Sequence, residues 1–266
     1  MPALILSEIY IYPVKSLGGI SVDSAIAETR GLKYDRRFLL VDENAMFMTQ
    51  RDFPQLALLK LSYSEKGFKV LNTKDNSHLI IPFESDSNKN ISVTIWDDVC
   101  KAVKLGNDFD DWFSNAAGKK CSLVYMPDDE KRIVEKKYIN DEHIVSFADA
   151  YPFLIIGQAS LENLNSRLQR PIPMNRFRTN FVFTGGNPYE EDYWKDFKIS
   201  DAKFKAVKPC ARCVITTTDQ DTAERSVEPL KTLSDYRKIN NKVMFGMNVV
   251  CNKPGIVSIN QKIELL

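Results

Sequence analysis

Two cysteines and two cations lie close together in the second half of the chain. Cys210 and Cys213 are separated by two residues, and Lys208 and Arg212 flank them in the segment KPCARC. Nearby positive charge lowers the pKa of a thiol and favours the thiolate, which is both a nucleophile and a ligand for soft metals. The apolar and hydroxyl residues 214–218 that follow predict a β-strand. We interpret Cys213 as a metal ligand.

The other residue types restrict which chemistry is available. The chain has five cysteines, an odd number, and only Cys210 and Cys213 are close in sequence, which argues against a disulfide framework. His78 and His143 are the only histidines, so a zinc site or a hydrolase with a histidine base would have few residues to use. We interpret His143 as a polar loop residue.

Charge and the first residues indicate the class of protein. A formal net charge of +1 in 266 residues gives no reason to expect binding to a nucleic-acid polymer or an acidic membrane. The first residues, MPALILSE, lack both a basic region and a long apolar stretch, so they predict neither a signal peptide nor a membrane span. A cytoplasmic protein is the simplest expectation, and any anion site must be a local cluster.

Candidate anion-binding residues occur early in the chain. The loop after a strand at residues 9–12 contains Lys15, Ser16 and two glycines, which let a backbone approach a ligand closely. Arg36 follows Asp35 just ahead of another predicted strand. A glycine turn with a solvated lysine explains the first segment equally well.

A second row of polar residues lies in the sequence MNRFRTNFVFT, residues 174–184. Arg176, Arg178 and Asn180 alternate with larger side chains, so on a strand they would share one face. Such a row is costly to bury without partners and must face water, carboxylates or an anion. The local sequence leaves these three alternatives open.

The elements that would position these residues are mostly short strands. One helix is predicted at residues 108–118, where acids start and a glycine ends an apolar pattern, and another carries Leu161, Leu164 and Leu168. A third is predicted to start near Pro229. This pattern predicts a β-rich α+β protein with a barrel or strongly curved sheet. Its principal predicted strands are residues 38–41, 46–51, 56–61, 68–71, 92–96, 122–126, 153–156, 204–207, 242–250 and 256–259.

Four motifs, taken in order, resemble one known family. YPVKS at residues 12–16, Asp35-Arg36, FRTN at residues 177–180 and CARC at residues 210–213 resemble the MOSC proteins. The most similar branch contains the mitochondrial amidoxime-reducing component and the bacterial YcbX reductases, and the resemblance covers nearly the whole chain. It implies an N-terminal β-barrel-like domain over residues 1–120 and a MOSC domain, a mixed β-barrel and sheet with a few helices, over residues 121–266.

The resemblance implies a molybdenum-molybdopterin cofactor (Moco) and a set of residues that bind it. Cys213 corresponds to the catalytic cysteine that ligates the metal, whereas Cys210 corresponds to no recognised ligand. The cofactor contacts would be Lys15, Ser16, Arg36, Arg178, Asn180 and Arg212. Thr179 stands where the family commonly has proline.

The implied activity is the reduction of N-hydroxylated compounds, namely hydroxylamines, amidoximes and hydroxylaminopurines, to amines or amidines. Bacterial members often carry a ferredoxin-like module, but no four-cysteine set follows residue 251 here. We therefore expect a separate electron-donor protein of the ferredoxin, flavodoxin or cytochrome type, unless the chain is a piece of a longer protein. The alternative is a cofactor-binding sulfur carrier, or a cofactor storage or transfer protein, without reductase turnover.

Overall fold

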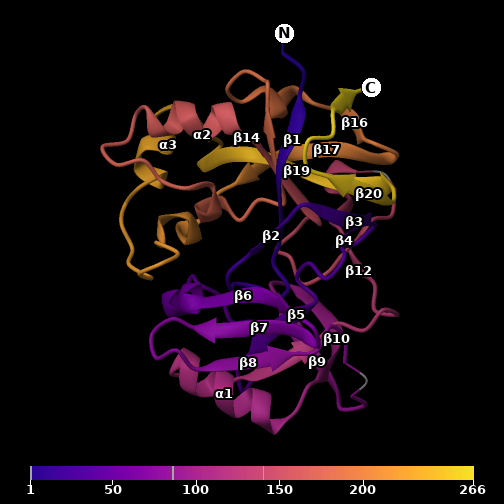
Figure 1. Ribbon diagram of the computed structural model, residues 1–266, viewed down its shortest axis with the longest axis vertical. Coiled ribbons are helices and arrows are strands. Elements are labelled where there is room, and N and C mark those ends of the chain that lie inside the picture. Colours follow the sequence, from indigo (N-terminus) through magenta and orange to yellow (C-terminus); the bar gives the residue numbers. More distant parts are fainter. Residues whose placement is uncertain (1, 86, 140) are drawn as a thin grey trace.

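The chain forms two lobes that are rich in strands (Figure 1). The computed structural model describes residues 2–85, 87–139 and 141–266. One lobe contains most strands of the first half together with the helix α1 (Asn107–Ala117), and the other contains the helices α2 (Gln158–Asn165) and α3 (Leu230–Tyr236). The predicted β-rich α+β fold class is confirmed.

A nine-stranded sheet organises the second lobe. Strand β14 pairs in parallel with β15, and the other pairs in the sheet are antiparallel. The path through the sheet is β2 (Ile20–Val22), β1 (Ile5–Ile11), β15 (Phe181–Thr184), β14 (Phe153–Gly157), β19 (Lys242–Lys253), β17 (Ala202–Ala211), β16 (Asp196–Ile199) and β21 (Ile263–Leu265), with β18 (Lys238–Ile239) beside β19.

Two smaller sheets and α1 form the first lobe. One sheet has the order β5 (Phe38–Val41), β11 (Ser122–Tyr125), β10 (Asp98–Lys104) and β9 (Asn90–Ile95), and the other has β6 (Leu59–Ser64), β7 (Gly67–Asn72) and β8 (His78–Ile81). Short sheets of β20 (Gly255–Ser258), β3 (Ser24–Glu28) and β4 (Gly31–Leu32), and of β12 (Arg132–Ile133) and β13 (Ile144–Val145), complete the strands of the described residues.

Each of the two predicted domains contributes a strand to the lobe formed mainly by the other. Strand β1 pairs with β15, as Ile9 lies opposite Phe181, while β11 pairs with β5 and β10 of the first lobe. The first and last parts of the chain therefore lie in one sheet. The domain boundary between residues 120 and 121 stays a prediction. Strands β1 and β11 each pair with strands from the other side of that boundary.

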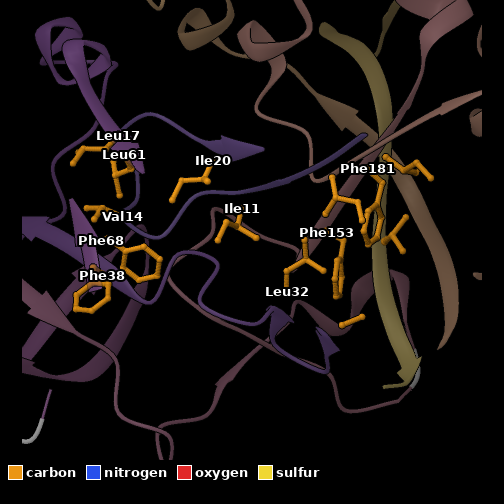
Figure 2. Close-up of a cluster of buried hydrophobic side chains, with 14 of the residues drawn as sticks. Ile11, Val14, Leu17, Ile20, Leu32, Phe38, Leu61, Phe68, Phe153 and Phe181 are labelled. Atoms are coloured by element: carbon orange, nitrogen blue, oxygen red, sulfur yellow. The ribbon is translucent and has the colours of Figure 1, made fainter. Parts of the chain in front are cut away.

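One apolar core runs through both lobes (Figure 2). Phe38 and Phe68 belong to the first lobe and Phe153 and Phe181 to the second, and all four are fully buried or nearly so. Figure 2 shows Ile11, in the N-terminal strand, between these two groups. Burying each such side chain stabilises the fold by about 2 kcal/mol, so this core holds the two lobes against each other.

The predicted helices occur, but some predicted strands do not. Helix α1 ends at Ala117, and Gly118 caps it in the left-handed conformation with φ 66°. The predicted strand at residues 46–51 was wrong, since that segment forms only isolated bridges. The predicted strand at 56–61 begins at Leu59, because the 3₁₀ turn Pro54–Leu58 precedes it. Proline at the first position favours that turn.

Candidate functional site

A cavity of about 260 Å³ lies where the loops of the two halves meet. Its wall is formed by segments far apart in the sequence, from the loop after β1 to the end of β17 and the middle of β19. All seven site residues predicted from the sequence line it: Lys15, Ser16, Arg36, Arg178, Asn180, Arg212 and Cys213. The fold therefore brings them together, and their individual roles stay a proposal.

Cys213 lies just beyond the end of β17. Its backbone is extended, and the next residues form the 3₁₀ turn Val214–Thr217, so the predicted strand over 214–218 was wrong. The hydroxyl of Thr216 donates to the Cys213 carbonyl at 3.0 Å, a local bond that favours a turn over a sheet ladder. The turn leaves the Cys213 side chain partly exposed at the cavity wall.

Cys210 lines the same cavity, and its sulfur contacts the Arg212 side chain. Nη1 of Arg212 donates to the Cys210 sulfur at 3.1 Å, and Nη2 of Arg212 donates to the Phe177 carbonyl at 2.6 Å. Cys210 thus helps to orient the Arg212 guanidinium, which gives this thiol a structural part beside Cys213.

Arg36 and Arg178 lie at one corner of the cavity. We call the group of residues there the tyrosine corner; it consists of Tyr12, Asp35, Arg36, Arg178 and Asn180. The two guanidinium groups lie over the Tyr12 ring, 4.6 and 4.4 Å from its centroid. Such cation–π contacts hold two like charges close together on one aromatic side chain.

Hydrogen bonds fix the tyrosine corner further. The guanidinium of Arg36 donates to the Asp35 carboxylate, to Asn180 Oδ1 at 3.2 Å and to the Arg178 carbonyl at 3.0 Å. The Asp35 carboxylate also accepts bonds from the Tyr12 backbone N–H and from Asn180 Nδ2. Burial raises the pKa of Tyr12 to about 12, although the two arginines oppose this, so the ring stays neutral at pH 7.

The backbone is strained at three of the cavity residues. Ser16, Arg36 and Arg178 have φ values of 67°, 51° and 54°, in the left-handed region that costs about 1 kcal/mol for a residue with a Cβ. The surrounding bonds stabilise these conformations, and strain of this kind is concentrated at functional sites.

The residues Arg176, Arg178 and Asn180, which would share one face on a strand, do not lie on one. Met174–Phe177 is a 3₁₀ turn, Arg178 is left-handed, and the strand begins only at Phe181. Arg176 therefore does not share a face with Arg178, and its guanidinium pairs with Asp219 at 2.7 Å. Alternating polarity over so few residues cannot distinguish a strand from a turn whose side chains reach different partners.

A second corner, which we call the aspartate corner, consists of Lys15, Asp149 and Arg51. The Asp149 carboxylate accepts Lys15 Nζ at 2.6 Å and Arg51 Nη2 at 2.7 Å. Lys15 Nζ also donates to the Phe147 carbonyl at 2.7 Å. Burial opposes the charged form of Asp149, but the two cations outweigh it and hold its pKa below the usual range.

Sequence reasoning missed Asp149 and Arg51. Burial lowers the pKa of Lys15 to about 8 despite the attraction of Asp149, so this lysine depends on the carboxylate for its charge. Burial also opposes a rise in the Arg51 pKa, but the Asp149 carboxylate outweighs it, with a smaller contribution from Cys213. In the sequence, Asp149 stands in residues 147–152, just ahead of the strand predicted at residues 153–156, and nothing local marks it as a site residue.

The cavity suits an anionic, polar ligand. Its wall carries six cationic side chains and one carboxylate, although the whole chain is nearly neutral. Among the residues that the structure describes, four buried donors at this wall have no hydrogen-bond partner: Arg51 Nη1, Arg178 Nη2, Arg212 Nε and Tyr151 Oη. Unpaired buried donors cost about 1–3 kcal/mol each, which an oxygen-rich ligand would recover. A phosphate group with a sulfur-bound metal fits the donors of Arg178 and Arg212 and the Cys213 thiol.

Comparison with known proteins agrees with this geometry. Residues 3–120 match the MOSC N-terminal beta barrel domain, and residues 142–264 match the MOSC domain. The mouse mitochondrial amidoxime-reducing component 1 is 31% identical over 98% of this chain and 82% of its own length. The chain belongs to the MOSC family.

Other relatives of this MOSC protein carry two kinds of name. The mitochondrial amidoxime reducing component 2 of Macaca fascicularis is 32% identical over 87% of this chain and 72% of its own length. The molybdenum cofactor sulfurase of rice is 31% identical over 91% of this chain, which spans only 32% of the sulfurase. The YuaD protein from Bacillus subtilis aligns over 99% of this chain and 95% of its own, with 11% identity and a TM-score of 0.43.

The family and these relatives are associated with the molybdenum cofactor, as the sequence motifs predicted. The reductase names place enzymes among the relatives of this chain. Among the described residues, no helix is long and apolar enough to cross a membrane.

Proposed function

We propose that this protein is a molybdenum-cofactor-dependent oxidoreductase that reduces N-hydroxylated compounds. Hydroxylamines and hydroxylaminopurines would give amines, and amidoximes would give amidines. The observation that carries the proposal is the cationic cavity with Cys213 at its wall, assembled from both halves of the chain. The reductase names of relatives about 30% identical over most of this chain support it.

Cys213 would ligate the metal, and the predicted cofactor residues would hold the pterin and its phosphate. When bound, the molybdenum would accept the oxygen of the substrate and exchange electrons with a donor. The guanidinium groups of Arg36, Arg178 and Arg212 would balance the negative phosphate. Ser16 and Asn180 would add hydrogen bonds at the cavity wall, and Lys15 would add positive charge beside Asp149.

The overall reaction fixes what must enter the site. The N–O bond of the substrate breaks, two electrons reduce it, one proton goes to nitrogen and one goes to the departing hydroxyl, which leaves as water. We propose that the electrons come from a separate protein of the ferredoxin, flavodoxin or cytochrome type. The substrate is a small molecule, and neither the near-neutral charge nor the cavity gives reason to expect a nucleic-acid polymer. A cytoplasmic location stays a prediction.

The test is the molybdenum and pterin content of the protein produced in cells that make the cofactor. Wild-type protein should contain molybdenum and reduce benzamidoxime with an artificial electron donor. Cys213→Ala should lose turnover because the metal loses its protein sulfur, whereas Cys210→Ala should keep molybdenum. Wild-type protein without molybdenum under these conditions would contradict the proposal.

A sulfur carrier or cofactor storage protein is the second candidate. The similarity to the rice molybdenum cofactor sulfurase favours it, as does the second thiol, Cys210, on the same cavity wall. A carrier or storage protein should bind the cofactor and show no steady-state reduction of benzamidoxime. Turnover with an artificial donor therefore separates the two candidates.

A further inference from the structure

Arg51 is the cation of the cavity that neither the sequence motifs nor the relatives assign to a role. It lies between β5 and β6 in a segment that forms no strand. Its guanidinium contacts the Asp149 carboxylate and lines the cavity together with Cys213. It therefore lies at the wall of the same cavity as the proposed metal ligand.

The main chain of Arg51 is held from two sides. Its N–H donates to the Thr49 hydroxyl at 3.0 Å, and its carbonyl accepts Nη2 of Arg225 at 2.5 Å. Arg225 belongs to the second half of the chain and also donates to the Gln50 carbonyl. The segment is thus fixed against the part of the chain that follows Cys213, which limits how far Arg51 can move.

The side chain of Arg51 is held as well. Its guanidinium carbon lies 4.7 Å from the centroid of the Trp96 ring, and Nη2 is bonded to Asp149. Trp96 is 48% exposed at the turn between β9 and β10, and the Asp149 side chain is 47% exposed. Both supports of Arg51 thus face solvent, unlike Tyr12 and Asp35, which are buried.

This placement separates Arg51 from the cations of the tyrosine corner. Solvent reaches both supports of Arg51, whereas Arg36 and Arg178 stack on the buried Tyr12 ring. The described residues offer no partner for Nη1 of Arg51, a buried donor. A fixed guanidinium with a spare donor suits an oxygen acceptor on the reacting molecule.

We propose that Arg51 binds the N-hydroxyl oxygen of the substrate and orients it toward the metal site at Cys213. Trp96 holds the guanidinium in place and offers the planar part of the substrate an aromatic surface. The inference rests on the proposed reductase function and adds its substrate class: N-hydroxyl groups on a planar, conjugated framework such as an aromatic amidoxime. It assigns Arg51 to the substrate and not to the cofactor.

The experiment compares Arg51→Gln and Arg51→Lys with the wild type in cofactor-loaded protein. For Arg51→Gln we expect unchanged molybdenum content and a fall in kcat/KM for benzamidoxime of about 10-fold or more, the effect of one lost charged hydrogen bond. Arg51→Lys should recover part of the lost kcat/KM. The matched control is Arg170→Gln, because Arg170 is exposed and takes part in no ion pair of the described residues. Arg178→Gln should lose molybdenum instead.

The aromatic surface is tested with acetamidoxime, which has the same reacting group and no ring. Trp96→Ala should raise the KM for benzamidoxime several-fold more than the KM for acetamidoxime, and Trp96→Phe, which keeps an aromatic ring, should recover part of this difference. Equal effects of Trp96→Ala on both substrates would overturn the assignment of a planar class.

Binding gives a readout that does not need turnover. Benzamidoxime should quench the fluorescence of Trp96 in the wild type and bind at least about 10-fold more weakly to Arg51→Gln. If the loaded wild type shows no turnover, the reductase proposal fails, and the binding titration still decides the role of Arg51. Equal affinity in the wild type and Arg51→Gln, or loss of molybdenum in Arg51→Gln, would overturn the inference.

Discussion

The tyrosine corner and the aspartate corner solve the same problem, the burial of several cations, in different ways. In the first, Arg36 and Arg178 stack on one ring and Arg36 pairs with Asp35, whose side chain is completely buried. In the second, Lys15 and Arg51 share Asp149, whose side chain is 47% exposed. The first corner is a fixed frame for an anion, whereas water and an arriving ligand can change the charge balance of the second.

The largest expected effect comes from Asp35→Asn in the tyrosine corner. The substitution leaves Arg36 buried without its carboxylate, so we expect a loss of about 3–5 kcal/mol in the free energy of unfolding. Urea denaturation measures it. Glu264→Gln, which breaks the surface pair of Glu264 with Lys198, should cost less than about 1 kcal/mol. Similar losses in both variants would remove the distinction that we draw.

The pH dependence of Lys15 is the next largest effect. Because burial lowers its folded pKa to about 8 from an unfolded value of 10.5, the unfolded chain binds more protons between these values. The free energy of unfolding of the wild type relative to Lys15→Met should therefore rise from pH 8 to pH 10.5, by on the order of 3 kcal/mol. Urea denaturation of both proteins across this range checks it, and a constant difference would show that Lys15 is not desolvated.

Asp149→Asn tests the exposure of the aspartate corner. Lys15 and Arg51 lose a shared carboxylate, but water reaches the site, so we expect a loss of about 1–2 kcal/mol. The loss should shrink in 0.5 M salt, since the Debye length falls well below its low-salt value. The loss in Asp35→Asn should hardly change with salt. Thermal unfolding at two salt concentrations compares the two variants.

Tyr12→Phe gives the smallest effect. The ring that supports both guanidinium groups is kept, and only the hydrogen bond from the hydroxyl to the Thr179 carbonyl is lost. We expect a cost of about 1 kcal/mol and an unchanged molybdenum content. Tyr12→Leu removes the ring and should lower the molybdenum content as well, so equal content in the two variants would argue against a role for the ring.

Local patterns predicted some elements well and others badly. Helix α1 was predictable because acids, an apolar stripe and Gly118 all indicate the same element. The segment after Cys213 was predicted as a strand from its β-propensity, but it is a 3₁₀ turn. The segment Met174–Phe177, whose alternating polarity would also suit a strand, is a 3₁₀ turn as well. Their side chains bond to partners such as Asp219 for Arg176, which lies 43 residues away, and no local pattern contains that information.

The site residues that belong to sequence motifs could be predicted, and the others could not. The motif residues from Lys15 to Cys213 line one cavity, although nothing local in the sequence distinguished Lys15 from a solvated lysine. Asp149 and Arg51 were missed because a single acid and a single arginine have many ordinary explanations. Only the hydrogen bond between them, across 98 residues of chain, shows that both belong to the cavity wall.

The sequence by itself determined the strand-rich class and a helix close to residues 108–118, and it predicted Arg212 and Cys213 as site residues. These depend on neighbouring residues or on motifs, which a sequence displays directly. Tertiary structure alone decided which cations are buried together, which carboxylate each one pairs with, and that Arg51 and Cys213 line one cavity. The physical reason is that burial and charge pairing depend on distances through space, and the fold sets these by joining both halves of the chain around one cavity.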